Sequence, residues 1–186
     1  MSALIVILAV FVATGAAVIA LYNGLVRSRN LAREGWSGID VQLKRRADLI
    51  PNLVDAVKGY MGHENTVLTK VTDMRAKTMQ APNLDEREKA EGQLANAVRV
   101  LLGVAESYPD LKASLNFQNL QKALSDTEEQ LQYARRYYNA AARDLNVKIG
   151  SFPGNLVAAL FRFREISYFQ LDNPSDSNAP NVKLSP

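Results

Sequence analysis

The chain opens with a long apolar segment. Residues 2–26 carry no charged side chain, and Ala3–Leu21 contains a single polar residue, Thr14. A helix of that length spans roughly 30 Å at about 1.5 Å per residue, which matches the hydrocarbon core of a bilayer. Tyr22 follows where an amphipathic aromatic side chain meets the headgroups. We therefore predict a transmembrane anchor over residues 1–26, with the lipid bilayer as its partner.

A cleavable signal peptide is the alternative interpretation of this segment, with Val18-Ile19-Ala20 as a small-residue cleavage site. Signal peptides begin with a basic stretch and carry an apolar run of about 7–15 residues. This segment lacks the basic stretch, and its apolar run is longer. Both features favour an anchor that is not cleaved.

Three arginines follow the apolar segment: Arg27, Arg29 and Arg33. The positive-inside rule therefore predicts a single-pass protein of the bacterial cell (inner) membrane, with an external N-terminus and a cytoplasmic C-terminal part. The three side chains are expected to contact anionic lipid headgroups, each contributing about 1 kcal/mol before screening. The whole positive excess of the chain lies in this region, since residues 27–63 hold seven basic and four acidic side chains.

Small residues recur within the anchor at every fourth position, at Ala9, Ala13 and Ala17. Such a stripe lets the backbones of two transmembrane helices approach closely. It predicts packing between spans, and hence a homo-oligomer. The alternative is that alanine is simply common in membrane-spanning helices.

Beyond the anchor, apolar residues recur at helical spacing and rarely alternate as they do in strands. One stripe runs from Trp36 to Val71 and predicts a single long helix that ends around Thr78–Pro82. Pro51 lies inside this stripe. Because proline lacks the N–H that continues the helical ladder, we expect a kink or a short break near Leu49–Ile50.

Two more long helices are predicted. The second starts at Asn83 or Asp85, where acidic side chains complement a helix N-terminus, and stops at Tyr108-Pro109. The third shows a heptad pattern over about four repeats and is closed by Gly150 and Pro153. Its predicted buried positions are Phe117, Leu120, Leu124, Thr127, Leu131, Ala134, Tyr138, Ala141 and Leu145.

The predicted fold is all-α: one N-terminal transmembrane helix continues into an antiparallel bundle of three long helices plus a short C-terminal helix, over residues 27–170. Residues 171–186 are predicted to form a flexible tail. If the three long helices leave, approach and leave the bilayer in turn, Phe152 lies far from the membrane. The aromatic stretch Phe152–Phe169 is then expected to cap the bundle or meet a neighbouring subunit.

A large part of the chain resembles a known family. Residues 22–64 read YNGLVRSRNLAREGWSGIDVQLKRRADLIPNLVDAVKGYMGHE, and this block resembles the LemA family of membrane-anchored bacterial proteins. The resemblance continues through MRAK (74–77), YPDLKAS (108–114), TEEQLQYARRYYNAAARDLN (127–146) and the terminal APNVKL. It implies a single N-terminal anchor and an antiparallel helical bundle. It implies no activity, although one member of the family belongs to an organelle-membrane-building system, which favours scaffolding.

The composition excludes most catalytic chemistry. Cysteine is absent and histidine occurs once, at His63, so thiolate nucleophiles, two-histidine metal sites and Ser–His–Asp triads other than one through His63 are excluded. The zinc-protease signature H-E-x-x-H would need a second histidine where Val67 stands. A net charge of +3 is too balanced for a nucleic-acid binder. We predict no catalytic site, no cofactor, no metal and no nucleic-acid partner.

The predicted function is that of a non-enzymatic, membrane-anchored helical scaffold that self-associates and acts through protein–protein contacts at the cell membrane, in membrane organisation or remodelling. The alternative is an adaptor or regulator of a membrane protease, sensor or transporter, which would make other membrane proteins its partners. Five side chains are expected to make interhelical or intersubunit contacts: Trp36, Asp40, Arg45, Arg46 and Asp48.

Overall fold

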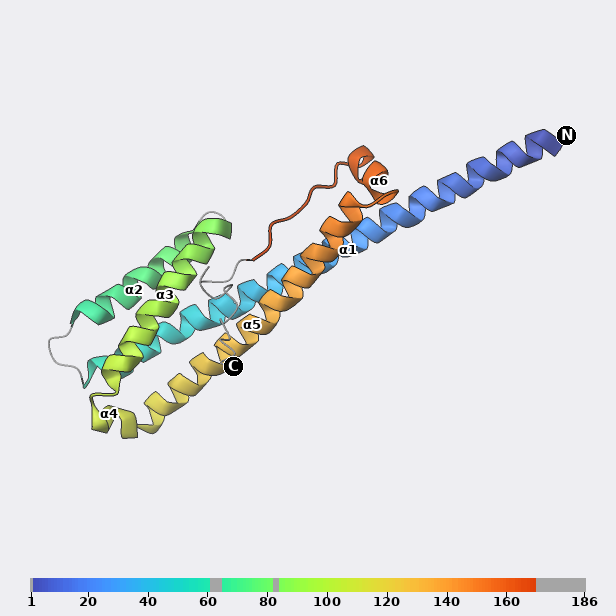
Figure 1. Cartoon of the computed structure of the whole chain (residues 1–186). Helices are drawn as coiled ribbons and strands as arrows, with labels where there is room; N and C mark the ends of the chain where they lie inside the picture. The colour runs from blue at the N-terminus through green and yellow to red at the C-terminus, as the bar shows by residue number, and fades with distance from the viewer. Residues whose placement is uncertain (1, 61–64, 82–83, 170–186) are drawn as a thin grey trace, which may run out of the picture. The chain divides into compact units, whose positions relative to one another are not determined.

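The structure is a computed structural model that describes residues 2–60, 65–81 and 84–169. Over these residues it is built from helices and contains no strand, so the all-α class is confirmed (Figure 1). His63 and the tail, residues 171–186, lie outside the described residues. The helices are α1 (Ser2–Lys58), α2 (Asn65–Gln80), α3 (Leu84–Ala105), α4 (Pro109–Ala113), α5 (Leu115–Gly150) and α6 (Gly154–Leu160).

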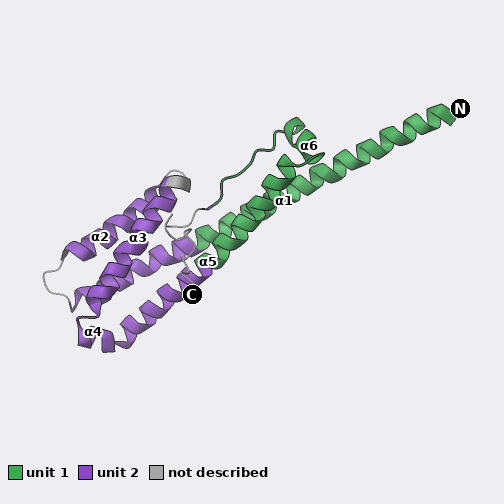
Figure 2. Cartoon of the chain, viewed as in Figure 1, with its two compact units in different colours: residues 1–41, 131–168 green, residues 42–130, 169–186 purple. Residues whose placement is uncertain are grey.

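The chain divides into two compact units, coloured in Figure 2. Unit 1 consists of Met1–Val41 and Leu131–Tyr168, and unit 2 of Gln42–Gln130 and Phe169–Pro186. Helices α1 and α5 each contribute one part to unit 1 and another part to unit 2.

Unit 1 is an antiparallel pair of helices with α6 packed at one end. Ser28 of α1 accepts a hydrogen bond from Lys148 of α5, and Gly38, further along α1, faces Ala134, further back along α5. Contacts that move forward on one helix and backward on the other define an antiparallel pair. The core at the α6 end consists of Leu25, Leu145, Val157 and Ala158.

Unit 2 encloses a larger apolar core that is built from parts of α1, α2, α3, α4 and α5. Its most deeply buried side chains come from all of these helices and include Leu53, Val57, Val71, Leu94, Leu101, Leu111 and Phe117. Each helix presents one apolar stripe to the others, as expected for amphipathic helices in a bundle.

The prediction of a single helix from Trp36 to about Pro82 is wrong. Helix α1 ends at Lys58, a turn follows in which the N–H of Tyr60 bonds the carbonyl oxygen of Val57 at 3.0 Å, and α2 begins at Asn65. The apolar stripe is interrupted at Glu64 and resumes in the same register beyond the turn, because both helices bury residues in the same core. Periodicity alone therefore does not reveal the turn.

Of the kink or short break expected near Leu49–Ile50, the break is absent, because α1 continues through Pro51 to Lys58. A proline inside a helix leaves the carbonyl four residues earlier without its usual donor, which here is the carbonyl of Ala47. In this structure the Nε of Arg75 donates a hydrogen bond of 2.7 Å to that oxygen. A side chain of α2 thus replaces the donor that α1 lacks.

The other two predicted long helices are present. Helix α3 begins at Leu84, between the two predicted starts, and ends at Ala105. Pro109 then occupies the first turn of the short α4, a position where its missing N–H costs nothing; α4 was not predicted. Helix α5 carries the heptad pattern, and all nine of its predicted core positions are buried or half-buried. The prediction for this helix is confirmed.

The helix directions that placed Phe152 far from the anchor are wrong as well, although α6 does pack at one end of the helix pair, as expected for a cap. In unit 1, Val157 and Ala158 of α6 pack with Leu25, and Val18 and Tyr22 of α1 lie against the same cluster. Helix α6 is therefore beside the end of the apolar segment rather than far from it. The error follows from counting α1 and α2 as one helix: the additional helix reverses the direction in which α5 runs.

Candidate functional site

The N-terminal part of α1 has the length and composition of a membrane span. Its most apolar 18-residue window has a mean hydropathy of 2.9, and none of that window is buried. Ala9, Ala13 and Ala17 are exposed there and, at four-residue spacing in a continuous helix, lie along one side. Their packing against another span stays a prediction.

The three arginines after this segment have different environments. Arg27 and Arg33 are exposed, whereas Arg29 is half-buried. The guanidinium carbon of Arg29 lies 4.9 Å from the centre of the Phe163 ring, within the range of a cation–π interaction. Arg29 therefore joins α1 to the segment after α6. Headgroup contact by the three arginines stays a prediction.

Aromatic side chains cluster where the apolar segment ends. The ring centre of Tyr22 lies 4.7 Å from that of Phe161 and 5.9 Å from that of Phe163, both in tilted or edge-on geometry. Such pairs stabilise a contact beyond the apolar area they bury. They fix the residues that follow α6 against α1.

The segment after α6 runs back along α5 and is held there by hydrogen bonds. The side chain of Asn146 donates to the carbonyl oxygen of Ile166 at 2.9 Å and accepts the N–H of Ile166 at 3.0 Å. The hydroxyl of Tyr138 donates to the carbonyl oxygen of Ser167 at 2.8 Å. Burial raises the pKa of the Tyr138 phenol above its usual value of 10.0. The side chains of Asn146 and Tyr138 thus position a backbone segment that belongs to no helix or strand.

Gly35 allows α1 and α5 to approach closely. A Cβ atom at Gly35 would lie 2.9 Å from the Cα of Tyr138 and 3.0 Å from a ring carbon of Tyr137, closer than real Cβ atoms tolerate against backbone. The neighbouring Trp36 ring meets the Tyr138 ring edge-on, with centres 5.8 Å apart. Trp36 is therefore part of the contact between the two helices of unit 1.

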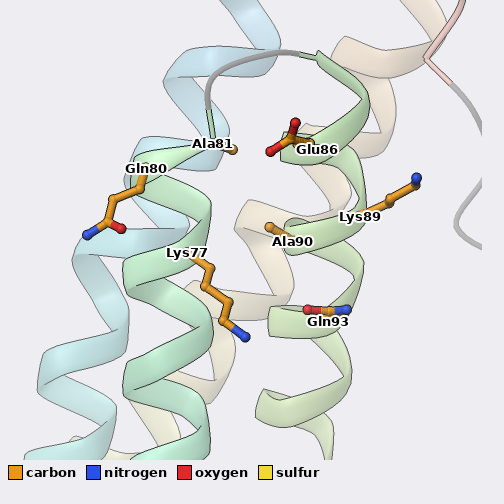
Figure 3. Close-up of a pocket in the computed structure, with 7 residues that line it drawn as sticks. All are labelled: Lys77, Gln80, Ala81, Glu86, Lys89, Ala90 and Gln93. Carbon is orange, nitrogen blue, oxygen red and sulfur yellow. The ribbon is translucent and has the colours of Figure 1, made fainter.

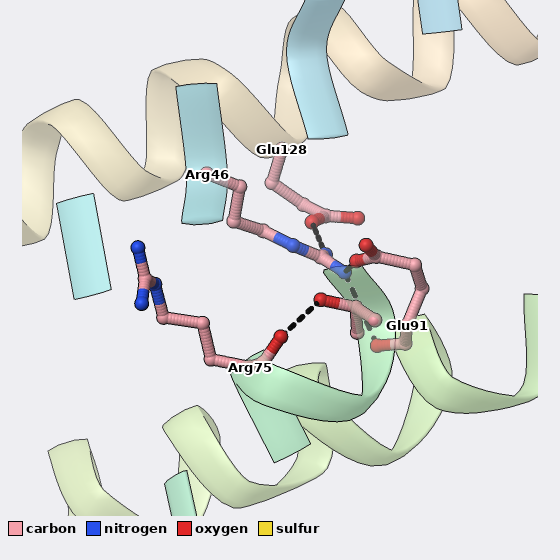
Figure 4. Close-up of polar contacts among 5 residues, drawn as sticks. Arg46, Arg75, Glu91 and Glu128 are labelled. Carbon is pink, nitrogen blue, oxygen red and sulfur yellow. Dashed lines mark hydrogen bonds and ion pairs between the residues drawn. The ribbon is translucent and has the colours of Figure 1, made fainter. Parts of the chain in front are cut away.

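Arg46 is the centre of a buried charged cluster in unit 2 (Figure 4). Its Nη1 donates to Glu128 of α5 at 2.8 Å, and its Nη2 contacts both the carboxylate of Glu91 and, at 3.1 Å, the carbonyl oxygen of Glu91 on α3. The side chains of Arg46 and Glu91 are almost fully buried. A single guanidinium thereby joins three helices through charge-assisted hydrogen bonds.

The remaining predicted contact residues lie elsewhere. Arg45 and Asp48 are exposed, and Asp40, in unit 1, is half-buried. The structure therefore does not bring the five predicted side chains together in one cluster. Interhelical or intersubunit contacts of Asp40, Arg45 and Asp48 stay predictions.

Sequence reasoning missed Glu91, Arg75 and Asn146. A signal was present for Glu91, because it falls three residues before Leu94 on the apolar stripe of α3 and is buried on that face. A charged residue on a buried stripe is seldom found without a partner. No comparable signal marks Arg75 or Asn146, whose partners are backbone groups in other segments.

Open depressions lie at the surface of the described residues. One lies between the end of α2 and the start of α3, lined by Lys77, Gln80, Ala81, Glu86, Lys89, Ala90 and Gln93 (Figure 3). Over residues 2–60, 65–81 and 84–169, no three His, Asp or Glu side chains are grouped in a way that could hold a metal ion.

These features define a class: an all-α protein whose first helix begins with an exposed apolar segment that is long enough to span a bilayer. A family model described as the LemA family matches residues 35–184, so the chain belongs to the LemA family. The resemblance seen in the sequence is thereby confirmed.

Several relatives are similar over most of the chain. Protein LemA of Metamycoplasma hominis is 30% identical over 152 residues, covering 80% of this chain and 68% of that protein. Magnetosome protein MamQ 2 of Paramagnetospirillum magneticum is 25% identical over 175 residues, and magnetosome protein MamQ of Magnetospirillum gryphiswaldense is 23% identical over 174. The matches cover 80% of this chain and 64% of each magnetosome protein, slightly less than two thirds of their length.

Proposed function

We propose that this protein is a non-enzymatic scaffold, anchored in the cell membrane by α1, that self-associates and acts through protein–protein contacts. The observation that carries the proposal is the apolar first part of α1, whose residues 2–17 are all exposed. An uncovered segment of this hydropathy is stable only in a bilayer or against other apolar surfaces.

The proposed orientation places the N-terminus outside and the helical bundle that follows the apolar segment in the cytoplasm. Arg27 and Arg33 are exposed directly after the apolar segment, and the positive-inside rule keeps such residues on the cytoplasmic side. The relatives named as magnetosome proteins favour a role in membrane organisation, which we extend to this chain as part of the proposal.

Self-association is supported by the apolar surface that unit 1 leaves exposed. A two-helix pair buries one stripe of each helix, and large side chains outside these stripes stay accessible. Leu31 and Val41 of α1 and Tyr133 and Tyr137 of α5 are exposed by 38–58%. Aromatic and aliphatic side chains of this kind are typical of the centres of protein–protein interfaces.

The second candidate is an adaptor that presents the same surface to a membrane protease, sensor or transporter. The exposed tyrosines favour it equally, because tyrosine is enriched in contacts between unlike proteins. The two candidates differ only in what covers the surface.

Photo-crosslinking of the full-length protein in its own membrane separates them. A photoreactive residue at exposed Tyr137 is expected to give crosslinks mainly between copies of the chain. The same residue at buried Leu131 is the matched control and is expected to crosslink only within one chain. A single foreign protein dominating the Tyr137 products would contradict the scaffold and support the adaptor.

A further inference from the structure

Helix α6 is held beside a part of α1 that requires apolar surroundings. Val18, Leu21 and Tyr22 of α1 pack against the cluster that contains Val157 and Ala158 of α6. Val18 and Leu21 belong to the apolar segment that is long enough to span a bilayer. If that segment lies in lipid, α6 lies at the lipid surface.

The outward face of α6 is also apolar. Val157 and Ala158 are buried towards the rest of unit 1, whereas Leu156 and Leu160, spaced four residues apart, are 62% and 72% exposed. Phe152, just before α6, is 79% exposed. The helix has one polar side chain, Asn155. A helix that is apolar on its outer face as well as its inner face suits an apolar environment rather than water.

Basic residues are in excess in the segments that pack together at this end of unit 1. Residues 22–33 and 146–166 together contain six basic residues and one acidic residue, Glu165. Arg27, Arg162 and Arg164 are exposed. Exposed apolar residues flanked by arginine are typical of segments that lie in the interface of a membrane containing anionic lipids.

The backbone at Arg162 provides an independent observation. Helix α6 ends with the N–H of Arg162 bonded to Ala159 and the N–H of Phe163 bonded to Ala158, which is the Schellman pattern. Arg162 occupies the left-handed position of this motif, with φ of 56°. Glycine is the residue that this conformation favours. An arginine held there against its backbone preference points to a role for its side chain beyond folding.

We propose that α6, with Phe152, Phe161, Arg162 and Arg164, is a second membrane contact. It lies in the headgroup region of the leaflet in which the apolar segment of α1 ends, near Leu21 and Tyr22. Its ligand is an anionic phospholipid surface: Phe152, Leu156 and Leu160 insert among the upper acyl chains while the arginines contact phosphates. This inference rests on the membrane anchoring of α1 but not on self-association.

The absence of cysteine makes a direct test practical, because any introduced cysteine is labelled alone. Three exposed alanines give chemically matched sites: Ala159 on α6, Ala140 on α5 and Ala16 within the apolar segment. Each full-length Ala→Cys variant carries an environment-sensitive fluorophore and is reconstituted into vesicles of phosphatidylcholine and phosphatidylglycerol. Nitroxide-labelled lipids then report depth by quenching.

We expect shallow nitroxides to quench the label at Ala159 and deep nitroxides to quench the label at Ala16, with the label at Ala140 unaffected. Ala140 lies roughly 15 Å from the end of α5 at about 1.5 Å per residue. Arg162→Gly and Arg164→Gln are each expected to lower the ratio of lipid-bound α6 to α6 away from the lipid surface by about fivefold in anionic vesicles. Arg162→Gly should at the same time leave thermal stability unchanged or raised, since it relieves the left-handed backbone.

Other outcomes are equally decisive. Quenching at Ala16 without quenching at Ala159 would overturn the α6 contact while leaving the anchor intact. Absence of quenching at Ala16 would overturn both the anchor and this inference. A blue-shifted label at Ala159 that lipid nitroxides fail to quench would mean that protein, such as a second copy of the chain, covers the face, and would also overturn it.

Discussion

The Nε of Arg75 bonds the carbonyl oxygen of Ala47 at 2.7 Å. This oxygen lies four residues before Pro51, so it is the acceptor that the missing N–H of Pro51 leaves open. Helix α1 therefore passes through a proline without a break, because α2 is packed against it in unit 2. The bond couples the local structure of one helix to the position of another.

Replacing Arg75 should reveal this coupling. Arg75→Leu is expected to lower the free energy of unfolding by about 1–3 kcal/mol, the cost of an unsatisfied buried acceptor. In a Pro51→Ala background the cost should be smaller, because the new N–H at residue 51 bonds Ala47 directly. Urea unfolding of the four proteins in detergent measures the difference. An Arg75→Leu cost that is equal in both backgrounds would contradict this role, and the exposed Arg99→Leu serves as the control.

The buried charges around Arg46 make a second prediction. Arg46→Met removes the cation that faces the buried Glu91 carboxylate and should cost about 3–5 kcal/mol. Combining Arg46→Met with Glu91→Met should recover much of that loss, because an apolar pair replaces a broken ion pair. Arg45→Met, at an exposed position, should change the stability by no more than about 0.5 kcal/mol. Thermal unfolding monitored by circular dichroism tests all three, and a double variant as unstable as the single one would argue against the ion-pair role.

The close approach at Gly35 makes a third prediction, with Gly38 as a matched control on the same helix. Gly38→Ala places its Cβ 3.9 Å from that of Ala134, an ordinary contact, and should gain about 0.5–1 kcal/mol from helix propensity. Gly35→Ala meets the Tyr138 backbone and should lose about 1–3 kcal/mol from overpacking. Melting temperatures that move in opposite directions would support the close contact. A stabilised Gly35→Ala variant would contradict it.

The buried Tyr138 predicts a dependence on alkaline pH. Burial raises the pKa of the Tyr138 phenol, so the folded state favours the neutral form. The stability that the neutral phenol contributes to the folded protein is therefore present below pH 10 and is lost as the pH rises through the raised pKa. Tyr138→Phe loses the bond to Ser167 and should cost about 1 kcal/mol near neutral pH. The cost of Tyr138→Phe should shrink above pH 10, because ionisation of Tyr138 then destabilises the folded wild-type protein. Urea unfolding across this range measures it, with exposed Tyr133→Phe as the control; a cost independent of pH would contradict the assignment.

The elements of the fold differ in how far the sequence predicts them. The heptad stripe of α5 is uninterrupted, and its residues are buried in the core of unit 2 and then in that of unit 1. The length and the buried positions of α5 therefore follow from periodicity. The stripe of α1 resumes in α2 after an interruption at Glu64, although a turn lies between the two helices. Gly59, a weak helix former directly after Lys58, was the available signal. Missing that turn reversed the predicted direction of α5 and with it the predicted location of Phe152.

The side-chain contacts were harder to predict than the helices. Arg46 was singled out, but its partners Glu91 and Glu128 lie 45 and 82 residues away along the chain. Which carboxylate faces a given cation depends on the packing of whole helices rather than on local spacing. The same holds for Asn146, whose partner Ile166 lies in a segment without regular structure.

The number of chains in one membrane-embedded particle tests the proposed scaffold most directly. We would measure the mass of the full-length protein in native membrane patches and in mild detergent over a range of concentrations. The proposal predicts particles of two or more copies that persist on dilution and weaken when bulky side chains replace Ala9, Ala13 and Ala17. A particle that contains one copy of the chain under every condition would contradict self-association.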